Sequence, residues 1–141
     1  MRHRKFSFKL GTNSSHRKSL IANSLKNLVE NGRIETTPAK AKEIRRHADK
    51  LITLAKKDTL ASLRRASAAL RVRRNTLTTK EQRNAKNGDT SAYNADREIL
   101  SKLYKTAERF KERNGGYTRI MRLDYTRSGD GSERCILEYL P

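Results

Sequence analysis

Several residue types that would indicate a particular chemistry are scarce in this chain of 141 residues. Cys135 is its one cysteine, which excludes an internal disulfide framework and a cysteine-based metal cluster. A lone thiol in an apolar run is most often a small buried hydrophobic side chain, and we expect this of Cys135. No stretch approaches the ~18 consecutive apolar residues of a membrane span, so no membrane partner is predicted.

A secretory signal is also missing, because the basic N-terminus lacks the apolar core that signal peptides carry. Arginine and serine are common in mitochondrial transit peptides as well, so that interpretation is weaker but stays open. The expected compartment is the cytoplasm of a bacterium, or an organelle of bacterial descent.

Apolar side chains are few, with 34% hydrophobic and 6% aromatic residues. Such a composition, combined with high charge, is typical of disordered proteins, and a partly unfolded basic protein is one alternative. The low aromatic content also argues against recognition of single-stranded bases by stacking. Any nucleic acid would then be bound through its shape and its backbone.

Acidic residues are scarce relative to basic ones. Lysine and arginine number 33 against 15 acids, which gives a net charge of +18 and a pI near 10.6. The first twenty residues, MRHRKFSFKLGTNSSHRKSL, contain no acid at all, and Glu30 is the first carboxylate. A surplus of this size favours polyanionic partners such as nucleic acid.

Periodicity predicts folded elements from Ser14 onward, because apolar residues recur at the spacings of three and four that mark a buried helix face. Ser14 or Ser15 can cap the first helix and Asn31-Gly32 can end it, whereas Thr37-Pro38 favours a second start. We predict an α+β domain over 14–141 that follows an extended basic arm over 1–13. Helices are expected over 14–31, 37–57, from 59 through the arginines up to 74, 79–85 and 94–113, and strands over 33–37, 117–125 and 134–140.

Finer expectations accompany these elements. Leu60, Leu63 and Leu70 should face inward on the third helix, and Gly115-Gly116 should end the last helix. The connection TRSGDGS predicts that the last two strands form a hairpin.

The sequence offers little to catalysis or metal binding. His3, His16 and His47 have no cysteine or paired carboxylate at ligand spacing. Ser14-Ser15-His16 are neighbours in a predicted helix and do not face one another, so they suggest caps rather than a nucleophile and its base. No catalytic residue, metal ligand, cofactor or small-molecule substrate is predicted, and an enzyme that modifies RNA is a remote alternative.

Three groups of basic residues are candidates for phosphate binding, although single charges are usually just solvated surface. The first is the acid-free N-terminus, the second opens the helix at Pro38, and the third is a run of arginines without acids. Arginine suits phosphate because its planar fork donates two hydrogen bonds at once. The candidates are Arg2, Arg4, Lys5, Lys9, Arg17 and Lys18; Lys40, Lys42, Arg45 and Arg46; and Arg64, Arg65, Arg71, Arg73 and Arg74.

A series of short words in order, MRHRK, LG, SSHR, RIETT, AKAKE, LITLAKK, RNGGYTRI and GDG, resembles the bacterial large-subunit ribosomal protein L17 family. The resemblance covers residues 1–66 and 110–140. It implies a two-layer fold of helices on a small mixed sheet, and a structural protein that binds large-subunit rRNA near the exit of the peptide tunnel. It further implies neighbouring large-subunit proteins as partners, a monomer within the subunit, and a role in assembly of that subunit.

Carried over to matching positions, the resemblance implies a set of rRNA contacts. These are Arg2, His3, Arg4, Lys5, His16, Arg17, Thr36, Thr37, Lys40, Lys42, Gly115, Gly116, Tyr117, Thr118 and Arg119. Thr12 stands where the family usually has arginine, so that contact is not carried over. Residues 72–95 are expected to be a family-variable insertion. The main alternative is a nucleoid-type DNA-binding protein, which would usually dimerise, and no heptad or spare apolar face indicates a dimer.

Overall fold

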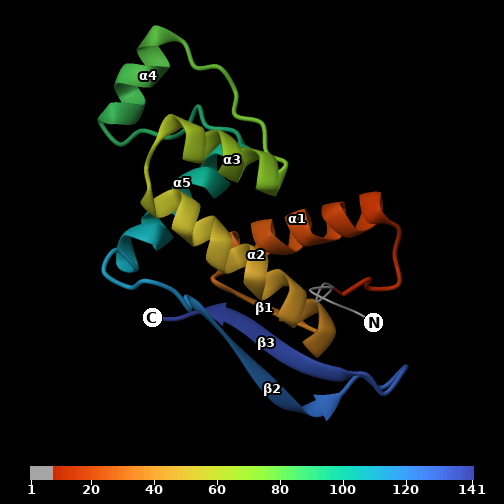
Figure 1. Ribbon diagram of the computed structural model, residues 1–141. Coiled ribbons are helices and arrows are strands. Elements are labelled where there is room, and N and C mark those ends of the chain that lie inside the picture. Colours follow the sequence, from red (N-terminus) through yellow and green to blue (C-terminus); the bar gives the residue numbers. More distant parts are fainter. Residues whose placement is uncertain (1–7) are drawn as a thin grey trace.

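Five helices and three strands make up residues 8–141, the part of the chain that the computed structural model describes (Figure 1). Residues 1–7, which include the candidates Arg2, His3, Arg4 and Lys5, lie outside the described residues. The elements are α1 (Ser14–Asn31), β1 (Arg33–Thr36), α2 (Pro38–Lys56), α3 (Leu60–Leu70), α4 (Thr79–Lys86), α5 (Ala95–Arg109), β2 (Thr118–Thr126) and β3 (Glu133–Tyr139).

The sheet has the strand order β1-β3-β2, with β3 in the centre. The predicted hairpin of β2 and β3 is confirmed, and β1 joins the other edge of β3 with Ile34 opposite Leu137. Both pairings are antiparallel, so the α+β class is confirmed, but the sheet is not mixed. The hairpin makes β2 and β3 antiparallel, and β1 also runs opposite to β3.

Helices cover one face of this sheet (Figure 1). Alternate residues of β3, Cys135, Leu137 and Tyr139, are buried towards α2, which lies across the sheet. Helices α1 and α5 pack on α2 in turn, and α4 projects from the body without a buried residue. The buried position of Cys135 agrees with its predicted role as a small apolar side chain.

Local signals place most helix ends at the predicted positions. Gly32 has a φ of 74° and its amide donates to the Leu28 carbonyl, which ends α1 in the left-handed conformation that glycine adopts without strain. Thr37 and Pro38 begin α2 as predicted. The predicted cap of α1 is at least one position late. Asn13 fills it, and its side chain accepts a hydrogen bond from the His16 amide at 2.8 Å.

The third helix is shorter than predicted and differently oriented. It ends at Leu70, and Arg71 takes a left-handed φ of 53°, so Arg73 and Arg74 follow the helix instead of extending it. Leu60 is 62% exposed rather than inward, because the amphipathic stripe of α3 starts with Ser62 and continues through Ala66 and Leu70. Thr59 and Ser62 form a capping box at its start.

The last helix also ends early. The prediction that Gly115-Gly116 end it is wrong, since α5 stops at Arg109 and Phe110 caps it. Phe110 turns into the core, where its ring lies 5.2 Å from that of Tyr117 and 6.4 Å from that of Tyr139. Packing of these three rings offsets the loss of further helical turns.

Residues 8–13, the described part of the predicted arm, contain no helix or strand. They are nevertheless attached to the domain. The Phe8 amide donates to Glu43 Oε2 at 3.2 Å, and the Arg46 guanidinium lies 5.8 Å from the centre of the Phe8 ring. Over residues 8–141, every helix is too short or too polar to span a membrane.

Candidate nucleic-acid interface

The start of α1 and the start of α2 lie at the same end of the molecule (Figure 1). Residues 8–12 reach that end too, because Phe8 is bonded to Glu43 on α2. Lys9, Lys18, Lys42 and Arg45 are exposed there or on the adjoining turns. Within the described part of the chain none of these four makes an ion pair, so their charge is available to an external anion.

Glu43 is an acidic residue among these basic ones. It is only 5% exposed, and its carboxylate lies 3.3 Å from Arg46 Nη1 and 3.8 Å from His47 Nε2. Together with the Phe8 amide, these groups surround a buried acid at the basic start of α2. Arg46, predicted as an rRNA contact, thus helps to anchor residue 8. The i, i+3 and i, i+4 spacings to Arg46 and His47 would have indicated this cluster from the sequence.

The arginines of the third candidate group divide between a helix and the segment after it. Arg64 and Arg65 are exposed on α3. Arg71 Nη1 donates to Ser19 Oγ at 2.6 Å, which links the end of α3 to α1. The Arg73 amide donates to Asp96 Oδ2 at 2.8 Å, whereas the side chains of Arg73 and Arg74 are exposed. Within residues 8–141 all five guanidinium groups lack an ion pair.

The remaining basic candidates and the two threonines surround the starts of α1 and α2. His16 is exposed and Arg17 half-buried on the first turn of α1. Thr36 and Thr37 are half-buried between β1 and α2, and Lys40 is half-buried on the first turn of α2. The Thr36 carbonyl accepts a hydrogen bond from Cys135 Sγ at 3.3 Å, so its backbone is committed to the sheet.

The predicted contacts over 115–119, which the resemblance supplied, are partly buried in the core. Tyr117 and Thr118 are 1% and 3% exposed, so their side chains belong to the core. Asp49 Oδ1 accepts hydrogen bonds from the Tyr117 amide at 3.2 Å and from Thr118 Oγ1 at 3.1 Å. No pattern in the sequence indicates this role for Asp49. Gly115 and Gly116 are exposed, and Arg119 is exposed but paired with Glu138.

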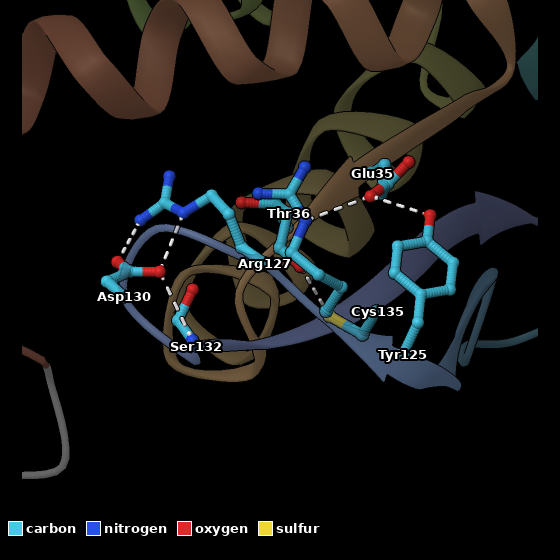
Figure 2. Close-up of polar contacts among 8 residues, drawn as sticks. Glu35, Thr36, Tyr125, Arg127, Asp130, Ser132 and Cys135 are labelled. Carbon is cyan, nitrogen blue, oxygen red and sulfur yellow. Dashed lines mark hydrogen bonds and ion pairs between the residues drawn. The ribbon is translucent and has the colours of Figure 1, made fainter.

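The outer face of the sheet and its hairpin loop carry charges that are paired within the protein (Figure 2). Glu35 Oε1 accepts hydrogen bonds from Arg134 Nε at 2.9 Å and from Tyr125 Oη at 3.0 Å. The hydrogen bond from Arg134, followed by that from Tyr125, holds the pKa of Glu35 below its usual value of 4.5. The hydrogen bond to Glu35 raises the pKa of Tyr125.

A second pair closes the hairpin loop. Arg127 Nε donates to Asp130 Oδ1 at 2.8 Å, and the Ser132 amide donates to the same oxygen at 3.2 Å (Figure 2). These hydrogen bonds, the one from Arg127 first, hold the pKa of Asp130 well below its usual value. The loop therefore uses its own charges to fix its shape.

Side chains that could hold a metal ion do not gather in the described part of the chain. Over residues 8–141, no three side chains of histidine, cysteine, aspartate or glutamate lie close enough together to hold one. Within residues 8–141 the interface therefore combines exposed basic residues that make no ion pair, among them Lys42, Arg45 and Arg64, with ion pairs at the sheet, in the hairpin loop and between α1 and α5.

Comparison with known proteins decides the family. A model of the family described as ribosomal protein L17 matches residues 20–140. The chain belongs to the ribosomal protein L17 family. It is accordingly a structural constituent of the large ribosomal subunit, takes part in translation and is not an enzyme.

Individual relatives agree with the family match. The chain is 56% identical over 141 residues to the large ribosomal subunit protein bL17 of Chlamydia trachomatis, with 99% of both chains covered. It is 55% identical to that of Chlamydia muridarum and 54% identical to that of Chlamydia pneumoniae, over the same length and with the same coverage. The predicted resemblance is thereby confirmed, and the matched region includes residues 67–109, which contain none of the resembling words.

Proposed function

We propose that the chain binds large-subunit rRNA mainly through the phosphate backbone, using the exposed lysines and arginines among the predicted contacts that make no ion pair within residues 8–141. These residues form the unpaired cation set, and the proposal includes residues 1–13 as a basic arm that RNA phosphates neutralise. The unpaired cation set consists of Lys9, Lys18, Lys42, Arg45, Arg64, Arg65, Arg71, Arg73 and Arg74.

The observation that carries this proposal is the contrast between these residues and the acids of the same chain. The acids that make ion pairs within residues 8–141 bond to other basic residues, chiefly at the sheet and at Glu43. The cations of this set therefore repel one another in the free protein. A row of phosphates neutralises them, and the counterions that the RNA releases add to the affinity. The buried side chains of Tyr117 and Thr118 are not part of the proposed surface.

The family, rather than the charge pattern, supports the position in the subunit that we propose. We infer that the chain lies near the exit of the peptide tunnel, beside other large-subunit proteins, as a monomer that supports subunit assembly in the bacterial cytoplasm. Crosslinking of the assembled subunit, followed by identification of the joined nucleotides and proteins, tests this placement.

The phosphate mechanism is tested by the salt dependence of binding to purified large-subunit rRNA. A protein with ~6–10 phosphate contacts loses ~10³–10⁵ in affinity between ~50 and ~200 mM salt. We expect a loss in this range, and a shallower dependence for a chain without residues 2–7. Affinity that barely changes with salt would contradict the proposal.

A sedimentation experiment separates this function from DNA binding. The chain should migrate with the large subunit at moderate salt and should not follow DNA. Sensitivity of its sedimentation to DNase, with no fraction in the subunit peak, would support a nucleoid-type protein instead.

A further inference from the structure

Helices α1, α2 and α3 surround a hollow of about 340 Å³ on the helical side of the molecule. Its floor is apolar and combines side chains from all three helices. The floor consists of Ile21 and Leu25 from α1, Leu51 and Leu54 from α2, and Ala68 and Ala69 from α3.

Basic side chains form the rim. Lys18, Lys50 and Arg71 are exposed, and within residues 8–141 none of the three makes an ion pair. Arg71 is held in place from two directions, since its backbone ends α3 at a φ of 53° and its guanidinium bonds to Ser19 Oγ. His47 completes the rim and faces Glu43 at 3.8 Å.

The dimensions and the chemistry restrict what can enter. A volume of 340 Å³ is at the lower end of the ~300–1,000 Å³ of ligand pockets, which is enough for one ring system but not for a helix. The floor favours a flat and largely apolar group, and three cations at the rim favour an anion attached to it. A nucleotide has both parts, since its base presents an apolar face and its phosphate is charged.

We propose that the hollow binds one unstacked nucleotide of RNA, with the base against the apolar floor and the phosphate beside Lys18, Lys50 and Arg71. Unstacked bases are the usual targets of proteins that distinguish one RNA segment from another. This inference rests on the proposed rRNA binding and adds a base-contacting site to a surface that otherwise recognises backbone.

The direct test uses the full chain labelled with ¹³C in its alanine methyl groups. Each of the four nucleoside 5′-monophosphates is titrated separately, and inorganic phosphate is titrated as the control ligand. We expect at least one nucleotide to shift the methyl signals of Ala68 and Ala69 saturably, at concentrations where phosphate leaves them unchanged. Equal shifts with phosphate, or no shift with any nucleotide, would overturn the inference.

Two variants localise the binding. Ala68→Phe fills the hollow with a ring of the protein's own and should weaken nucleotide binding by about tenfold or more. Ala61→Phe is the matched control, because Ala61 is also exposed on α3 but does not line the hollow. The Ala61→Phe variant should bind nucleotide with the affinity of the unchanged chain. Lys50→Gln leaves the floor intact and should weaken binding through the phosphate alone. Unchanged affinity in both Ala68→Phe and Lys50→Gln would refute the site.

Chemical probing of the rRNA complex separates this inference from the function on which it rests. Ala68→Phe should keep the salt dependence of rRNA binding but expose one nucleotide that the unchanged chain protects. An identical protection pattern in Ala68→Phe would reject the nucleotide site while leaving rRNA binding intact. If an acidic peptide of another large-subunit protein shifted the Ala68 and Ala69 methyl signals and no nucleotide did, the hollow would be assigned to a protein partner instead.

Discussion

The helical side and the outer face of the sheet are both rich in basic residues, but three arginines of the sheet and its hairpin loop bond to acids, whereas the predicted contacts on α2 and α3 mostly do not. On the sheet, Arg119 and Arg134 bond to carboxylates of neighbouring strands, and Arg127 bonds to Asp130 within the hairpin loop. On α1, α2, α3 and their flanks, the unpaired cation set has no such partners within the described residues. The uncompensated part of the net charge of +18 therefore includes the unpaired cation set, and these are the residues for which we propose an external polyanion.

Removing the same number of charges from each region gives the largest expected difference. Lys42→Gln, Arg45→Gln and Arg64→Gln combined should reduce the salt slope of rRNA binding by ~0.7–0.9 for each phosphate that is no longer neutralised, and the affinity by roughly 10²-fold near ~0.1 M salt. Filter binding or fluorescence anisotropy over a salt series measures both quantities.

The matched triple variant replaces Arg119, Arg127 and Arg134 by glutamine. Its salt slope should stay unchanged, because those guanidinium groups already bond to carboxylates, and its stability should fall slightly. If both triple variants lost affinity equally, the contrast between the two regions would have no functional meaning.

Glu43 is a buried acid on the otherwise cationic start of α2, and its removal should have an intermediate effect. Glu43→Gln keeps the shape but loses the charge that Arg46 and the Phe8 amide approach. Loss of these charge-assisted hydrogen bonds should lower the free energy of unfolding by about 1–3 kcal/mol, as measured by urea denaturation.

Glu108→Gln is the control for Glu43→Gln, since Glu108 is exposed on α5 and makes no ion pair within residues 8–141. It should change the stability by no more than about 0.5 kcal/mol. Equal losses in the two variants would mean that the burial of Glu43 has no energetic consequence, and that residue 8 is not anchored through it.

Local signals explain which parts of this structure could be predicted. Gly32, Thr37-Pro38 and the loop between β2 and β3 act on their immediate neighbours, so the sequence reveals them directly. Most of the unpaired cation set is evident in the same way, because a surplus of one charge needs no knowledge of the fold.

Long-range interactions explain what the sequence does not reveal. Glu35 and Arg134 are 99 positions apart, and Asp49 and Thr118 are 69 positions apart, so only the folded chain brings them together. Tyr117 follows two glycines and so resembles a surface residue, but ring packing with Phe110 draws it into the core and also ends α5 early. The hollow between α1, α2 and α3 depends on the assembly of three helices and has no counterpart in any single segment.

The smallest expected effect concerns acid pH and the paired region alone. The pKa of Glu35 is lower in the folded chain than its usual value of 4.5, so its contribution to stability is complete above pH 4.5. As pH falls below 4.5, the unfolded chain takes up the proton first and the free energy of unfolding decreases. Glu35→Gln should remove part of this decrease in urea denaturation on either side of pH 4.5. Glu35→Gln in an Arg134→Gln background should change the loss of stability below pH 4.5 much less, because Arg134 is the main cause of the lowered pKa of Glu35. An equally large change in that background would show that the pair does not govern the pH dependence.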